Sequence, residues 1–454
     1  MKLSYFVNDK DFYKNLFAIA IPIMFQNLIN SFVNVLDTVM IGRLGTVEIA
    51  AVGLGNNVFF FYMIILFGLC SGGAVFIAQF WGKRDLGGIR KTVGLCCTVS
   101  LVIGSIFTLA VALVPDRIIG IYSADEEVIA AGARYLRWLA PSFLPFALAQ
   151  VLVLSLRSIE QVKTPMLTTV IALSVNAVLN WLLIFGIGPF PALGVAGAAL
   201  ATTVARLVET LLLFGICRRK QFPVIGPLRE MCAFNRAFIT RFIRIVSPVL
   251  ANEFVWSLGV AMQNIIFART HTDAIAAFNI TGTISQLTWV LFIGLGNGVG
   301  VLIGKKIGEG DHAGARDYAL KIIFFAPLAA VGAALVLIPI SWLIPLIFRV
   351  NETVLHTAGR MILIMAALYP CRAFNMSMVV GICRAGGDTV FCAIYDVAFM
   401  WLIALPAAAI ASLVFHVPFW LSYLLVLSEE FFKMLAGIWR FRSGKWLHDV
   451  TRGL

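Results

Sequence analysis

Long apolar segments, each able to cross a lipid bilayer, dominate the hydropathy pattern of the chain. A helix needs about 20 apolar residues to span the hydrocarbon core, and segments of that length recur from residue 15 to residue 440. The pattern predicts an all-α polytopic membrane protein with twelve transmembrane helices. The expected spans are 15–41, 52–79, 92–114, 129–154, 165–187, 194–217, 243–268, 278–303, 318–345, 358–382, 391–414 and 418–440.

Composition and charge agree with this class. Hydrophobic residues make up 60% of the chain and charged residues 13%, whereas soluble domains are about 45–50% apolar and 25% charged. Most Lys and Arg residues fall in alternate loops, as they do in cytoplasmic loops of membrane proteins. We therefore expect a multi-pass protein of the cell membrane with both termini in the cytoplasm. The net charge of +12 then reflects topology in the bilayer, and nucleic acid is not an expected partner.

The chain contains an internal repeat. Pro22 aligns with Pro248 at an offset of 226, and Arg157 aligns with Arg384 at an offset of 227. Each copy holds six expected spans, so both copies enter the membrane from the same side as a parallel repeat. We expect two six-helix pseudo-symmetric lobes. The predicted domains are an N-lobe at 1–220, a cytoplasmic linker at 221–242 and a C-lobe at 243–454.

The first expected span carries a polar face. Asn27, Asn30, Asn34 and Asp37 follow one another at intervals of 3, 4 and 3 residues, which places them on one side of a helix. A carboxyl group in a membrane helix costs about 2.5–3.5 kcal/mol on insertion scales, and such groups by default mark functional sites. Burial favours the neutral form of a carboxyl, so Asp37 is expected to take up a proton. Its oxygens alternatively suit a sodium ion.

Polar residues in other spans extend this hypothesis. Asn176 and Asn180 in the fifth span and Thr202 in the sixth lie at a depth similar to that of Asp37. Asn side chains also join membrane helices by hydrogen bonds. Both a ligand role and a structural role are therefore open for Asn176 and Asn180. In the second half, Glu253 lies near the middle of the seventh span and is either a functional acid or a structural one.

Further polar side chains in the spans supply candidates for substrate binding. Arg372 requires a partner at membrane depth, and Glu253 is one candidate. Arg206 and Glu209 are expected to pair with each other. The i,i+4 spacing of Glu429 and Lys433 predicts a structural ion pair. The substrate-binding candidates are Asn34, Trp256, Asn279, Gln286, Tyr369, Arg372 and Asn375.

Motifs of several other protein classes are missing from the sequence. No Walker motif indicates ATP-driven transport, and no Ser-His, His-Asp or HExxH arrangement indicates an enzyme. The cysteines and histidines have no metal-ligand spacing, so no structural metal is expected. We expect no cofactor.

Four strings resemble the multidrug and toxic compound extrusion (MATE) transporters of prokaryotes. They are LDTVMIGRLGTVEIAAVGLGN, LRSIEQVKTPM, GVAGAALATTVAR and CRAGGDT. The resemblance covers nearly the whole chain and implies two six-helix lobes and alternating access. It implies a secondary active antiporter that exports drugs, organic cations or amphiphilic metabolites in exchange for H⁺ or Na⁺, and we expect a monomer. The alternative is a lipid-linked oligosaccharide or lipid flippase of the same superfamily.

The resemblance also implies roles for individual residues. Asp37 matches the first-helix acid of the family's N-lobe cation site, and Asn176, Asn180 and Thr202 resemble its partners. Some prokaryotic relatives have a second Asp where Asn180 stands, so this site has one negative charge fewer, which weakens sodium binding and leaves protonation open. Glu253 is similar to the seventh-helix acid of a C-lobe cation site in the norfloxacin-exporter branch. The tenth-helix Asp that partners it there is missing from this sequence.

Overall fold

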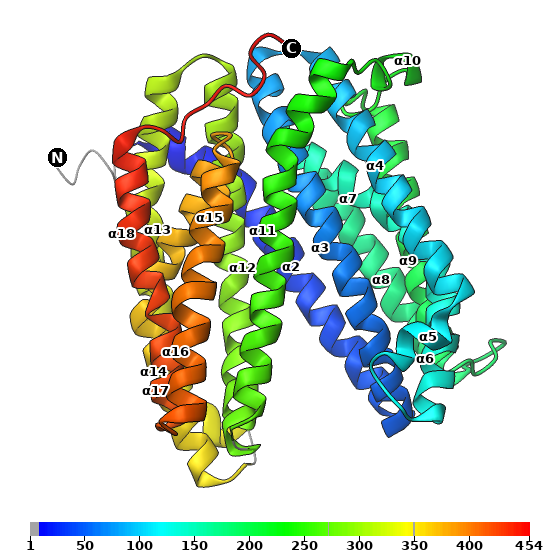
Figure 1. Cartoon of the computed structure of the whole chain (residues 1–454). Coiled ribbons are helices and arrows are strands. Elements are labelled where there is room, and N and C mark those ends of the chain that lie inside the picture. Colours follow the sequence, from blue (N-terminus) through cyan, green and yellow to red (C-terminus); the bar gives the residue numbers. More distant parts are fainter. Residues whose placement is uncertain (1–8, 271, 348–349) are drawn as a thin grey trace. The chain divides into compact units, whose positions relative to one another are not determined.

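The described residues of the computed structural model, 9–270, 272–347 and 350–454, are almost entirely helical (Figure 1). No strand occurs among them, and the predicted all-α class is confirmed. In the first half the elements are α2 (Lys10–Gly42), α3 (Thr46–Lys83), α4 (Leu86–Leu113), α5 (Pro115–Gly120), α6 (Glu126–Leu139), η1 (Ala140–Ser142), α7 (Phe143–Ser158), α8 (Lys163–Phe185), α9 (Val195–Arg219) and α10 (Leu228–Met231).

The second half repeats the pattern of long helices. Its elements are α11 (Arg236–Ala268), α12 (Thr272–Gly308), α13 (His312–Ile347), α14 (Glu352–Met376), η2 (Ser377–Cys383), α15 (Thr389–Phe399), η3 (Met400–Ala404), α16 (Leu405–Ala409), η4 (Ile410–Val414), α17 (Phe419–Leu427) and α18 (Glu429–Ser443). Here η1 is a 3₁₀ turn, whereas η2, η3 and η4 are π-helical turns. Pro22 in α2 and Pro248 in α11, which the repeat aligns, both lie inside long helices.

Eleven helical segments of the described chain are long and apolar enough to cross a membrane. They coincide with the first eleven predicted spans. The twelfth, 418–440, falls on α17 and α18, which are separated at Ser428. Because of this break, neither helix alone has the length of a span, although the two follow each other directly.

The chain divides into two compact units. One comprises residues 25–242, and the other comprises residues 9–24 together with the described residues of 243–453. The beginning of α2 thus belongs with the second half of the sequence. Lys321 of α13 contributes to this, because its Nζ lies 2.5 Å from Asp9 Oδ2 and 2.5 Å from Asp317 Oδ2. The hydrogen bond from Lys321 lowers the pKa of the Asp9 carboxyl.

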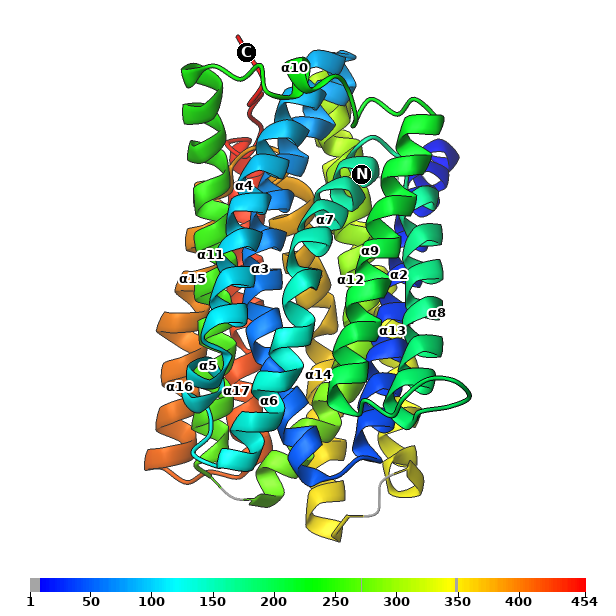
Figure 2. The same cartoon turned by 90° about the vertical axis from the view of Figure 1, so that its right-hand side faces the viewer.

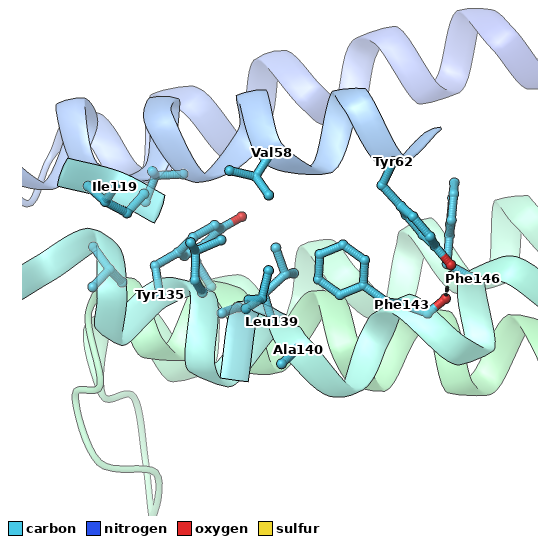
Figure 3. Packing of buried hydrophobic residues seen from close by; sticks show 14 of the residues in the cluster. Val58, Tyr62, Ile119, Tyr135, Leu139, Ala140, Phe143 and Phe146 are labelled. Atoms are coloured by element: carbon cyan, nitrogen blue, oxygen red, sulfur yellow. Dashed lines mark hydrogen bonds between the residues drawn. The ribbon is translucent and has the colours of Figure 1, made fainter. Parts of the chain in front are cut away.

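Aromatic side chains pack against one another in the interior of the 25–242 unit. Figure 3 shows Tyr62 of α3 against Phe143 and Phe146 of α7. The Tyr62 hydroxyl donates to the Phe143 carbonyl at 2.6 Å, which satisfies the polar end of an otherwise apolar side chain. Figure 2 shows α8 and α9 running side by side in this unit. These two helices carry most of the polar residues described next.

Candidate functional site

Asp37 of α2, Asn176 and Asn180 of α8 and Thr202 of α9 come together in the 25–242 unit. The Asn180 amide nitrogen donates to Asp37 Oδ1 at 2.7 Å and to Asn176 Oδ1 at 3.3 Å. The Asn176 amide donates in turn to Thr202 Oγ1 at 3.3 Å. We call these four residues the Asp37 site. The sequence named all four, and the structure shows that they are in contact.

A close approach of two helices positions the site. A Cβ atom on Gly197 of α9 would lie 2.6 Å from the carbonyl oxygen of Leu183 on α8, so only glycine allows this separation. Five residues further along α9, Thr202 then reaches Asn176. Asn176 and Asn180 are one turn apart on α8 and therefore present both amides on the same face.

The polar atoms of the Asp37 site are largely withdrawn from the surface. Asn176 and Asn180 are buried, with 4% and 1% of their surface exposed, while Asp37 and Thr202 are half-buried. Asn180 Oδ1 has no hydrogen-bond partner in the described part of the chain. The site therefore holds one carboxylate, and beside it an amide oxygen that is able to accept a proton or a cation.

A second polar group lies on the same three helices and on α7. Arg157 donates to Gln26 at 2.6 Å, and Gln26 donates to Thr169 at 2.6 Å. Thr169 donates to Glu209 at 2.7 Å, and Glu209 pairs with Arg206 at 2.9 Å. The expected pairing of Arg206 with Glu209 is confirmed. Glu209 accepts from two side chains, so its buried charge is compensated.

In the other unit, Glu253 of α11 pairs with Arg384, which directly follows η2. Arg384 Nη2 lies 2.8 Å from Glu253 Oε1, and the two side chains expose 4% and 16% of their surface. The proposed pairing of Arg372 with Glu253 is therefore wrong. Arg372 instead lies 3.8 Å from Glu430 Oε1 and stacks on Trp289, 4.6 Å from the ring centre. Glu430 comes from α18, which the sequence could not place beside α14.

A charged cluster connects α14, α15 and α18 in this unit. Lys433 contacts Asp396 at 3.1 Å and Glu429 at 3.4 Å. The contact of Glu429 with Lys433 is as expected, and Asp396 joins it from α15. Asn375 donates to Glu430 Oε2 at 2.7 Å and accepts from the hydroxyl of Tyr395. Asn375 is therefore a buried structural contact as well as a substrate-binding candidate.

The remaining substrate-binding candidates lie in different environments. Asn34, Asn279 and Gln286 are exposed on their helices, and Trp256 is half-buried. Tyr369 is buried and its hydroxyl contacts that of Thr288. The structure thus does not gather the predicted set into one cluster. Asn279 and Gln286 do lie on one exposed face of α12, seven residues apart.

Three residues that make these contacts are not among the predicted site residues. Gln26 lies one residue before the polar face of the first span, Arg384 lies between the predicted spans 358–382 and 391–414, and Glu430 lies inside the predicted span 418–440. A signal existed for Arg384, because the repeat aligns it with Arg157. Their roles come from tertiary contacts, since each partner lies on a distant helix.

Two helical units with charged groups buried at membrane depth define a polytopic membrane protein of the transporter class. The sequence profile of the MatE family matches residues 22–182 and 248–410. The two matches begin 226 residues apart, which is the offset of the internal repeat. The chain belongs to the MatE family, and its fold class of twelve transmembrane helices in two lobes is confirmed.

Similar proteins span nearly the whole chain. An uncharacterized transporter of Bacillus subtilis, YisQ, is 25% identical, with 97% of this chain and 96% of that protein covered. A probable multidrug resistance protein, NorM, of Thermotoga maritima is 24% identical, with 95% and 93% covered. A crystal structure of MATE in complex with MaL6 superposes with a TM-score of 0.87 at 19% identity, over 97% of this chain and 98% of that one. This last likeness concerns the fold alone.

Proposed function

We propose that the protein is a secondary active antiporter that exports drugs, organic cations or amphiphilic metabolites in exchange for H⁺ or Na⁺ by alternating access. The observation that carries the proposal is the Asp37 site. Its acid lies inside a long apolar helix, and its hydrogen bond among the described residues comes from the neutral amide of Asn180. Among the described residues no basic side chain forms an ion pair with Asp37, and Arg206 of α9 is held by Glu209, so this acid is suited to binding a mobile cation.

The hydrogen bonds suggest how an ion would act on the helices. As a carboxylate, Asp37 accepts from the Asn180 amide nitrogen. A protonated carboxyl donates instead, and the available acceptor is Asn180 Oδ1, which has no partner among the described residues. Turning the amide to offer that oxygen breaks the bond from Asn180 to Asn176. A sodium ion would require the same turn, because it needs oxygen ligands.

The ion therefore changes the contacts between α2, α8 and α9, and it binds two arrangements of these helices with different affinity. Such a difference is what an ion needs in order to drive a conformational change. The site has a single carboxylate, and a proton needs only that one group to bind. We propose H⁺ as the first ion to test and Na⁺ as the second.

Substrate contacts are proposed for the second unit. Trp256 and Trp289 offer ring faces for organic cations, although Trp289 already stacks on Arg372. Asn279 and Gln286 on the exposed face of α12 would supply hydrogen bonds. We further propose a monomer in the cell membrane with both termini cytoplasmic and with neither cofactor nor enzymatic activity.

Transport into proteoliposomes with imposed gradients tests the proposal. Ethidium movement is measured with a pH gradient alone, a sodium gradient alone and no gradient, for the wild type and Asp37→Asn. We expect one gradient to drive the wild type. We expect the gradient-driven rate of Asp37→Asn to be at least about tenfold lower than that of the wild type, which corresponds to about 1.4 kcal/mol. Expression of the variant should be normal. Unchanged driven transport in this variant would contradict the role of Asp37.

The same liposomes distinguish the alternative function. If ethidium and a fluoroquinolone both fail to move under either gradient, a labelled lipid-linked oligosaccharide is the next substrate to test. Movement of that lipid by the wild type would favour a flippase.

A further inference from the structure

The two units contain the same arginine contact at positions related by the internal repeat. Arg157 donates to Gln26 at 2.6 Å, and Arg384 donates to Glu253 at 2.8 Å. In both pairs the partners are 131 residues apart, and a shift of 227 residues converts one pair into the other. The geometry is shared, but the partner is a neutral amide in one unit and a carboxyl in the other.

The surroundings of Arg384 hold it in place. The segment that follows it is fastened to the C-terminal residues: His448 donates its amide to the Gly386 carbonyl at 2.8 Å, and Gly387 forms a bridge with Leu447. Trp446, which directly precedes Leu447 and His448, is fully buried. In Figure 1 the red C-terminal trace passes near the beginning of α15, where this loop enters the helix.

A second ion pair fixes the same loop from the side of α18. Arg440 donates to both carboxylate oxygens of Asp388, at 2.7 and 2.9 Å. Asp388 lies four residues after Arg384, at the start of α15. Bidentate pairs of this kind are strong and directional. Arg384 therefore points at Glu253 from a loop that is tied down at two points.

A mobile cation would have to displace this arginine to reach Glu253. The guanidinium is nearly fully buried and already supplies a positive charge at hydrogen-bond distance. At Asp37, by contrast, the described contacts are with neutral side chains. The two acids, which the sequence places in equal roles, therefore meet different electrostatic conditions.

We propose that Arg384 is the resident counter-cation of Glu253, occupying the place that a coupling ion would take, so that the second unit needs no ion of its own. This inference rests on the proposed antiport, in which Asp37 binds the coupling ion. Glu253 and Arg384 then act as a positioning pair that joins α11 to the loop after η2, as Gln26 and Arg157 join α2 to the end of α7.

The test counts coupling ions in full-length variants. Glu253→Gln creates the same glutamine–arginine contact that Gln26 and Arg157 form at the equivalent position of the other unit. In proteoliposomes, the ion gradient that just balances an opposing ethidium gradient gives the number of ions per substrate. We expect Glu253→Gln to accumulate ethidium within about threefold of the wild type, because a neutral hydrogen bond replaces the ionic one. The number of coupling ions should be the same.

Arg384→Gln and the double variant sharpen the result. Removal of the arginine leaves a buried acid without its cation, and we expect a loss of about tenfold or more. Removal of both charges in Arg384→Gln with Glu253→Gln should restore transport and the original ion count. A purely steric role of Arg384 would leave the double variant as defective as Arg384→Gln, and that outcome would overturn the proposal.

Two other outcomes separate this inference from the proposed function. A Glu253→Gln protein that exchanges ethidium but has lost one coupling ion would show that Glu253 binds the ion, and would overturn the inference while leaving antiport intact. An Asp37→Asn protein that keeps full coupling would instead refute the Asp37 role on which the inference rests, and would overturn both.

Discussion

The two repeats hold buried or half-buried polar residues at four equivalent positions and differ in charge at two of them. The pairs related by a shift of 227 residues are Gln26 and Glu253, Arg157 and Arg384, Thr169 and Asp396, and Arg206 and Lys433. The 25–242 unit has neutral side chains where the other unit has two acids. Both units keep their two basic residues.

This difference separates structural charges from a functional one. In the 25–242 unit, the acid Glu209 is not one of these four positions, but it is bonded to two of them, Arg206 and Thr169. Asp37 lies outside the group, among amides. In the second unit, the acids Glu253, Asp396 and Glu429 each contact a basic residue. A buried acid with a fixed cation contributes to the fold, whereas an acid without one is available for an ion.

The largest effect is expected from breaking the cluster of the second unit at Lys433. Lys433→Met leaves Asp396 and Glu429 without their cation, and removing one partner of a buried ion pair costs about 3–5 kcal/mol. Thermal denaturation in detergent measures the loss. Lys433→Arg is the control, because the equivalent position in the other unit is Arg206. A Lys433→Met protein as stable as the wild type would show that the charges are not coupled.

A smaller effect is expected where α8 meets α9. In Gly197→Ala the new Cβ would meet the Leu183 backbone at 2.6 Å, and overpacking of this kind costs about 1–3 kcal/mol. The helices should separate, which weakens the contact of Thr202 with Asn176 and lowers coupled ethidium transport. Gly215→Ala on the same helix is the control, since a Cβ atom at this position would have no neighbour within 4 Å apart from the adjoining backbone of its own helix. Equal transport by the two variants would contradict this account.

The most specific change alters the charge of the Asp37 site. Asn180→Asp places a second carboxyl beside Asp37, and two adjacent carboxylates cannot both stay ionised without a cation. We expect sodium to stimulate the variant about tenfold more than the wild type, which corresponds to about 1.4 kcal/mol. Asn180→Ala removes the hydrogen bond without adding charge and should show no such gain. An unchanged sodium response in Asn180→Asp would argue against a cation site here.

The sequence predicted the helices because bilayer thickness sets a length that apolar runs must match. Spacing alone also placed Asn176 and Asn180 on one helical face and indicated that Arg206 would pair with Glu209. The twelfth span was less regular than its hydropathy implied, since α17 and α18 separate at Ser428. Hydropathy averages over a window and does not register a local break in hydrogen bonding.

By itself, the sequence determined the membrane class, the repeat and the identity of the acids at membrane depth. Only the tertiary structure decided which acids have a fixed cation. Arg384 and Glu253 are 131 residues apart, and no local rule of spacing indicated that Arg372 pairs with Glu430 and not with the expected Glu253. Local spacing determines which residues share a helical face, but the packing of helices that are distant in the sequence determines which faces meet. That Asp37 forms no ion pair with a described basic residue is therefore a property of the fold.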